Sequence, residues 1–132
     1  MKSLMESIIQ EDEKSCLEHI EKLVIAKRLK MKKPKIVCLC GSTRFKDQYE
    51  KTMRELTLQG IIVLSVGLFG HLEGLDMNGE TKKMLDELHL RKIDLSDEIF
   101  VINVDGYIGE STRREIEYAK KTGKKINYLQ EI

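Results

Sequence analysis

Two short loops hold the residues whose types and spacing suit chemistry. The first loop is Gly41-Ser42-Thr43-Arg44, which directly follows a run of apolar residues. A glycine lets a ligand approach the backbone, and free N–H groups at the start of the following helix, together with an arginine, suit an anion such as phosphate. The same residues also suit a plain helix N-cap made by Ser42 or Thr43 with a surface arginine, so both interpretations stay open. The loop lacks the glycine and lysine spacing of a Walker A motif.

The second loop spans residues 105–115, and its candidate ligand-contacting residues are Asp105, Gly106, Gly109, Ser111 and Glu115. Glu115 is expected near the first turn of a helix, facing the edge of the sheet, where a carboxylate can attack or stabilise a developing cation. The alternative is a capping box, in which Glu115 only returns a hydrogen bond to the backbone of Thr112. On the local sequence alone, the capping box is the favoured interpretation.

A histidine and three cysteines are the remaining candidates. His89 lies near Asp86 on a predicted helix, where a single histidine is more often structural or exposed than catalytic. Cys38 and Cys40 are two residues apart in a predicted strand, so both side chains point to one face of the sheet. Their type suits a metal site, but the sequence offers no partner cluster, so we interpret them as small buried core residues and predict no metal site. With Cys16 they make an odd number of cysteines, which indicates reduced thiols in a cytosol.

These candidates depend on a regular alternation of strands and helices. The predicted strands cover residues 36–40, 61–66, 99–104 and 125–129, and the predicted helices cover residues 3–30, 45–59, 80–95 and 111–122, with a long loop at 67–79. Short continuous apolar runs are typical of strands buried on both faces, and connections of this length allow parallel pairing. In the helix at residues 80–95, the side chains expected to be buried are Met84, Leu85, Leu88 and Ile93.

The alternation predicts a three-layer, doubly wound α/β fold of the flavodoxin or Rossmann type, with a parallel sheet and right-handed crossovers. The strand that ends at Cys40 should be central, between the strands at residues 61–66 and 99–104. Residues 1–33 are expected to form an N-terminal helical extension, and residues 34–132 the α/β domain. Ligands bind such sheets at the carboxyl ends of strands where the strand order reverses, which is the edge that carries both loops.

The composition excludes several classes of protein. The chain has 132 residues, a net charge of +1, 41% hydrophobic residues and 34% charged residues, which is typical of one soluble folded domain. The near-balanced charge argues against general nucleic-acid binding. No apolar run has the length of a membrane span, and the N-terminus lacks the features of a secretory signal, so we expect a cytoplasmic protein without membrane contact.

Three segments, in order, carry a resemblance to a known family. They are the strand and loop at residues 36–44 (IVCLCGSTR), the pair Ser96-Asp97 before the strand at residue 99, and residues 115–119 (EIEYA) after the glycine-bearing loop. Through these segments, residues 35–129 resemble the nucleoside 2-deoxyribosyltransferase superfamily, including its nucleotide N-glycosidase branch. The resemblance implies an enzyme that cleaves the bond between base and sugar in a small nucleoside or nucleotide, without a cofactor, as a homodimer or higher homo-oligomer.

The resemblance also implies roles for individual residues. Glu115 matches the carboxylate that attacks the anomeric carbon, and His89 stands where the family has an acidic residue that helps the leaving base. Asp105 would orient the sugar or Glu115, while Glu117 replaces a glycine of the family pattern. The implied substrate-binding residues are Gly41, Ser42, Arg44, Gly106, Gly109 and Ser111, of which Ser42, Arg44 and Ser111 suit a 5′-phosphate. Two other functions stay open: a nucleotide-binding or sensing domain without turnover, and a structural dimer module built on the first helix.

Overall fold

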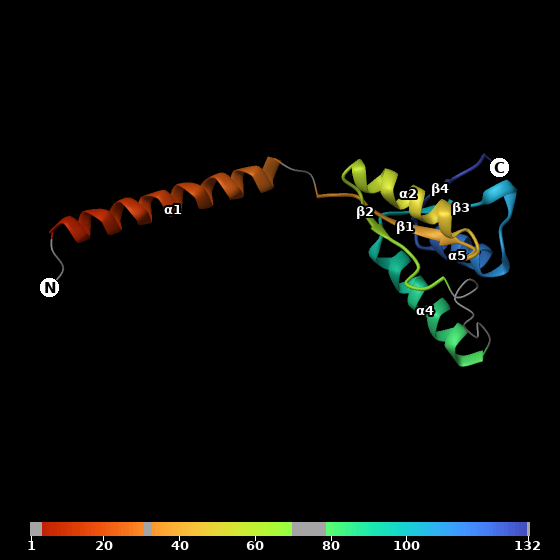
Figure 1. Cartoon of the computed structure of the whole chain (residues 1–132). Coiled ribbons are helices and arrows are strands. Elements are labelled where there is room, and N and C mark those ends of the chain that lie inside the picture. Colours follow the sequence, from red (N-terminus) through yellow and green to blue (C-terminus); the bar gives the residue numbers. More distant parts are fainter. Residues whose placement is uncertain (1–3, 31–32, 70–78, 132) are drawn as a thin grey trace. The chain divides into compact units, whose positions relative to one another are not determined.

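The computed structural model describes residues 4–30, 33–69 and 79–131 (Figure 1). The chain divides into two compact units, Met1–Lys33 and Pro34–Ile132. The first unit holds the helix α1 (Leu4–Lys30), and the second is an α/β domain. Most of the loop predicted at residues 67–79 lies outside the described residues.

The described part of the α/β domain contains a parallel sheet of four strands in the order β2-β1-β3-β4. The strands are β1 (Ile36–Gly41), β2 (Ile62–Leu64), β3 (Glu98–Ile102) and β4 (Lys125–Tyr128). In β1, Val37 pairs with Val63 on one side and with Glu98 on the other, so β1 is central. These pairings confirm the predicted parallel sheet and the predicted place of its first strand.

Strand β2 is shorter than the six residues predicted for it. It forms one end of the sheet and pairs only with β1 through the described residues, in a register that starts with Ile36 opposite Ile62. The exposed fraction of Ile62 is 45%, so the strand within the apolar run at residues 61–66 is not buried on both faces as predicted. An apolar run predicts that a strand exists better than it predicts where the strand ends.

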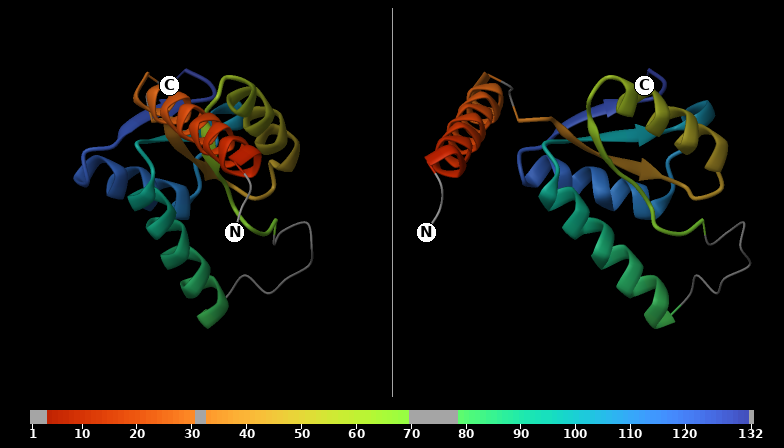
Figure 2. Two further views of the ribbon diagram at one scale, coloured as in Figure 1. Left: turned by 90° about the vertical axis from the view of Figure 1, so that its left-hand side faces the viewer. Right: turned by 60° about the vertical axis from the view of Figure 1, so that its left-hand side comes forward.

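Helices cover both faces of the sheet, as the doubly wound prediction requires (Figure 2). The helix α2 (Lys46–Leu58) packs on one face, where Tyr49 joins Val37 in a buried cluster. The helices α4 (Gly79–Leu95) and α5 (Glu110–Lys121) cover the opposite face. The chain moves outward from β1 to β2 through α2 and then returns past β1 to β3 through α4. Right-handed crossovers in opposite directions place these two helices on opposite faces.

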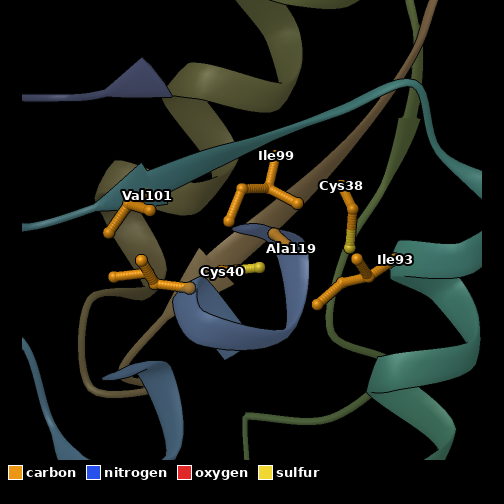
Figure 3. Close-up of a cluster of buried hydrophobic side chains, with 7 residues drawn as sticks. Cys38, Cys40, Ile93, Ile99, Val101 and Ala119 are labelled. Carbon is orange, nitrogen blue, oxygen red and sulfur yellow. The ribbon is translucent and has the colours of Figure 1, made fainter. Parts of the chain in front are cut away.

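The core beneath α4 and α5 contains the two cysteines of β1. Figure 3 shows this cluster, which consists of Cys38, Cys40, Ile93, Ile99, Val101, Ile116 and Ala119. Both cysteine side chains have an exposed fraction of 0%. The predicted burial of Cys38 and Cys40 in the core is therefore confirmed.

The buried face of α4 differs from the prediction. Met84 and Leu88 were expected in the core, but their exposed fractions are 56% and 48%. The buried residues of α4 are His89 and Ile93. A polar histidine takes a core position because its ring meets the thiols of β1 across the interface between helix and sheet.

The helix α1 belongs to the first compact unit. It is 27 residues long. Its described apolar residues are exposed, namely Leu17, Ile20, Leu23, Val24 and Ile25. Over the ranges that the structure describes, no helix has both the length and the apolar character needed to cross a membrane.

Candidate active site

A cavity of about 560 Å³ opens at the carboxyl ends of β1 and β3. The strand order reverses at this point, because β2 lies on one side of β1 and β3 on the other. Doubly wound sheets bind ligands at such a reversal. Of the predicted site residues, the cavity wall contains Gly41, Ser42, Arg44, His89, Gly109, Ser111 and Glu115.

Gly41 shapes the loop after β1. A Cβ atom at this position would lie 2.9 Å from the carbonyl oxygen of Ile102, at the end of β3. The hydroxyl of Tyr49 donates a hydrogen bond to the carbonyl oxygen of Gly41 at 2.8 Å, which ties the loop to α2. The close approach of two strand ends explains why a residue without a side chain occupies this position.

The predicted capping of the following helix by Ser42 or Thr43 is wrong. The N-cap of α2 is Phe45, and this position has no side-chain capping bond. The Oγ atom of Ser42 instead accepts hydrogen bonds from Arg44, from its backbone N–H at 3.4 Å and from its Nε at 3.0 Å. The guanidinium of Arg44 also lies 4.6 Å from the ring centroid of Tyr107. These contacts hold the arginine in the cavity wall.

The capping-box interpretation of Glu115 is also wrong. The helix α5 begins at Glu110 with Gly109 as its N-cap, and the N–H of Arg113 donates to the carbonyl oxygen of Gly109 at 2.9 Å. Thr112 therefore lies inside the first turn, where it is buried, and not at the N-cap. Without a cap to complete, the side chain of Glu115 lines the cavity.

The carboxylate of Glu115 is buried and incompletely hydrogen-bonded. Among the described residues, its Oε2 atom is buried and has no hydrogen-bond partner. Burial raises the pKa of Glu115 to about 7, although the charge of His89 opposes the rise. A buried acceptor without a partner costs free energy, so this atom suits a ligand or a reacting group better than a purely structural role.

Next to Glu115, two cysteines and a histidine form a buried polar cluster. The Nε2 atom of His89 lies 3.6 Å from the Sγ atom of Cys38 and 3.5 Å from the Sγ atom of Cys40. A hydrogen bond with Cys40 lowers the pKa of the Cys38 thiol to about 6, and His89 adds to this effect against the burial of the group. The pKa of Cys40 is raised by the hydrogen bond with Cys38, by burial and by the charge of Glu115.

The pKa of His89 also depends on its neighbours in this cluster. Burial lowers the pKa of His89, but the hydrogen bond with Cys38 and the charge of Glu115 outweigh it, so the pKa is raised. The sequence showed no partner for the two cysteines. His89 is that partner, and it is 49 residues from Cys40 along the chain.

Three basic side chains of the cavity wall, those of Lys82, Lys92 and Arg114, were not predicted from the sequence. The Nζ atom of Lys82 donates to Oδ2 of Asp86 at 2.7 Å and to Oγ of Ser111 at 3.0 Å, which joins α4 to α5. The charged residues of the wall are Arg44, Lys82, Lys92 and Arg114 on the cationic side and Asp86, Glu110 and Glu115 on the acidic side. Lys82, Asp86 and His89 follow the i, i+4, i+7 spacing of one helix face, and this spacing was the available signal.

Two predicted site residues do not join the others. Asp105 and Gly106 lie in η1 (Val104–Gly106), a short 3-10 turn after β3, and both are exposed. Neither lines the cavity, whose wall includes Tyr107 and then Gly109. The backbone φ of Asp105 is 52°, in the left-handed region that asparagine and aspartate tolerate better than most residues. The left-handed backbone conformation at this position explains why an aspartate occurs in the turn.

The arrangement brings the carboxylate of Glu115, the imidazole of His89 and the loop with Ser42 and Arg44 to one cavity. This combination suits attack on an electrophilic carbon, proton transfer to a leaving group and binding of a phosphorylated substrate. No protein-family model matches the sequence, and a search of curated proteins finds no matching relative.

Proposed function

We propose that this chain is a nucleoside or nucleotide 2-deoxyribosyltransferase-like enzyme that cleaves the N-glycosidic bond through Glu115. The observation that carries the proposal is the Oε2 atom of Glu115, which is buried and has no hydrogen-bond partner in the described part of the chain. A nucleophilic carboxylate needs an oxygen that no other protein group occupies. The absence of a capping bond at the start of α5 removes the structural explanation for this residue.

The proposed reaction has two displacement steps. In the first step, Glu115 forms a bond to the anomeric carbon, the N-glycosidic bond breaks, and its electron pair leaves with the base. His89, which lines the same cavity, gives a proton to the departing base. In the second step, another base or water attacks the anomeric carbon and returns a proton to His89, and the bond to Glu115 breaks to restore the carboxylate.

We further propose that the substrate carries a 5′-phosphate. The hydroxyl of Ser42, the guanidinium of Arg44 and the amine of Lys82 all line the cavity. The start of α5 lies in the same wall and offers backbone N–H groups at the positive end of the helix dipole. Together these groups suit a dianion better than a neutral sugar hydroxyl.

A substrate panel tests the proposal. The full chain is incubated with 2′-deoxynucleosides and their 5′-monophosphates, with and without a second base, and free base is measured by chromatography. We expect base release from at least one monophosphate. Release that needs the second base indicates a transferase, and release without it indicates a hydrolase. Absence of base release from every substrate contradicts the proposal, and thermal stabilisation by a nucleotide without release favours a nucleotide-binding domain.

The variant Glu115→Gln tests the role of the carboxylate. Glutamine keeps the size of the side chain and removes the attacking oxygen anion, so turnover should fall by about 10³-fold or more. The matched control is Glu117→Gln, which removes the same charge from an exposed position of the same helix. It should keep the turnover of the unmodified chain. Undiminished base release from folded Glu115→Gln chain contradicts the assignment of the nucleophile.

We also propose that the chain assembles as a homo-oligomer in a reducing, cytoplasmic setting. The exposed apolar residues of α1 support the assembly, because burial of such side chains between copies releases ordered water. The three cysteines are free thiols, which supports the reducing setting.

A further inference from the structure

The cluster of Cys38, Cys40 and His89 is not used as a unit by the proposed reaction. We propose that these three residues form a binding site for a Zn²⁺ ion in the core next to the cavity. Their ligand atoms all lie within 4.8 Å of one another, and all three residues are buried. The inference rests on this cluster and does not depend on the proposed function.

The distances within the cluster match those of a tetrahedral zinc site. With Zn–S bonds of about 2.3 Å and Zn–N bonds of about 2.0–2.1 Å, a sulfur and a nitrogen ligand lie roughly 3.6 Å apart in a tetrahedron. The Nε2 atom of His89 lies 3.6 Å from the sulfur of Cys38 and 3.5 Å from the sulfur of Cys40. An ion therefore fits between these atoms with little movement of the backbone.

The fold holds the ligands in this position from two elements. Residues two apart in a strand point to the same face, so β1 presents both thiols toward α4 and α5 (Figure 3). The helix α4 packs on that face and brings His89 against them. Two thiolates and an imidazole form a soft ligand set, which favours Zn²⁺ over the hard cations Mg²⁺ and Ca²⁺.

Glu115 supplies the second observation. Glu115 lines the cavity together with His89, and its Oε2 atom is buried without a hydrogen-bond partner within the described residues. Zinc binding releases the protons of both thiols, and the divalent cation then offsets the negative charge of the two thiolates beside this carboxylate. His89 and Glu115 also line the cavity, so the cavity adjoins the cluster and water from it can serve as the fourth ligand.

Metal binding is tested on the full chain after reduction and removal of metal with a chelator. Zn²⁺ is added, unbound ion is removed by gel filtration, and bound zinc is measured by mass spectrometry. We expect one ion per chain. The same protein loaded with Co²⁺ should show intense thiolate-to-cobalt absorption and the visible spectrum of a tetrahedral site. Because this spectrum is recorded on the unmodified chain, its absence overturns the proposal whatever the variants do.

Cysteine variants then locate the site. Cys38→Ser and Cys40→Ser should each weaken zinc binding by more than about 100-fold, because even residues behind the ligands contribute 10- to 100-fold. Cys16→Ser is the matched control, since Cys16 is an exposed thiol on α1 and should leave binding unchanged. Zinc affinity that survives in folded Cys38→Ser chain, or is lost in Cys16→Ser, overturns the proposal.

Discussion

Replacing Glu115 with glutamine should stabilise the metal-free protein in a pH-dependent way. The pKa of Glu115 rises from an ordinary 4.5 to about 7 in the fold, mainly because the carboxylate is buried. Each pKa unit corresponds to about 1.36 kcal/mol, so keeping this group ionised costs the folded state on the order of 3 kcal/mol at high pH. Glutamine has no such cost, because it stays neutral at every pH.

The direction of this pH dependence follows from the order in which the unfolded and the folded chain ionise. Well below pH 4.5 the carboxyl group is protonated in both states, and its burial costs nothing beyond that of a neutral group. As the pH rises toward about 7, the unfolded chain ionises first, and the free energy of unfolding falls. Above about pH 7 the carboxyl group of the folded chain ionises too, and the free energy of unfolding falls no further.

The assay is urea unfolding of both chains with a chelator present, at one pH below this range and one above it. The quantity of interest is the change in the stability difference between variant and unmodified chain. Any fixed cost of the glutamine amide cancels in that comparison. We expect the variant to gain about 3 kcal/mol relative to the unmodified chain between the two conditions, and Glu117→Gln to gain nothing. A stability difference that does not change with pH would refute the claim that burial perturbs Glu115.

Four further outcomes are expected. Gly41→Ala should destabilise the fold by about 1–3 kcal/mol in chemical unfolding, because the added Cβ atom would lie 2.9 Å from a backbone oxygen. Gly67→Ala is the control and should change the stability little, because nothing lies within 4 Å of its added Cβ atom. Lys82→Met should weaken binding of a nucleoside monophosphate, measured by calorimetry, much more than binding of the nucleoside, and equal losses would argue against a phosphate contact. Light scattering should give a multiple of the monomer mass at high micromolar concentration, and a monomer mass would contradict the assembly. Zinc bound at Nε2 of His89 should slow base release, because a metal-bound imidazole no longer forms the imidazolium that gives its proton to the base. Unchanged rates in the zinc-loaded chain would mean that His89 does not serve both roles.

The strands were predictable because their signal is local. The run that ends at Cys40 is apolar without interruption, which only a central strand of a parallel sheet requires, and β1 occupies that place. The start of α5 was not predictable from the same kind of signal. The pair Thr112 and Glu115 satisfies the capping-box pattern, but Gly109 begins the helix earlier and moves Thr112 into the buried first turn.

The cluster behind the site was missed because its members come from distant parts of the chain. A strand pattern places Cys38 and Cys40 on one face, but no sequence rule connects them with a histidine 49 to 51 residues away. The error at Met84 and Leu88 has the same origin. Hydrophobicity alone favoured these side chains for the core of α4, whereas contact with the thiols favoured His89.

The chain has one exposed cysteine and two buried ones, so the rates of thiol labelling can report on opening of the α/β domain. A thiol-specific reagent reaches Cys16 on α1 directly, but it reaches Cys38 and Cys40 only when α4 or α5 moves away from the sheet. In a metal-free sample, the ratio of the two labelling rates therefore measures how often this face of the domain opens, with an internal reference in every molecule. A ligand that contacts His89 and Glu115 bridges α4 and α5 and should slow labelling of the buried pair alone. Occupancy of the cavity thus becomes measurable without any knowledge of the reaction.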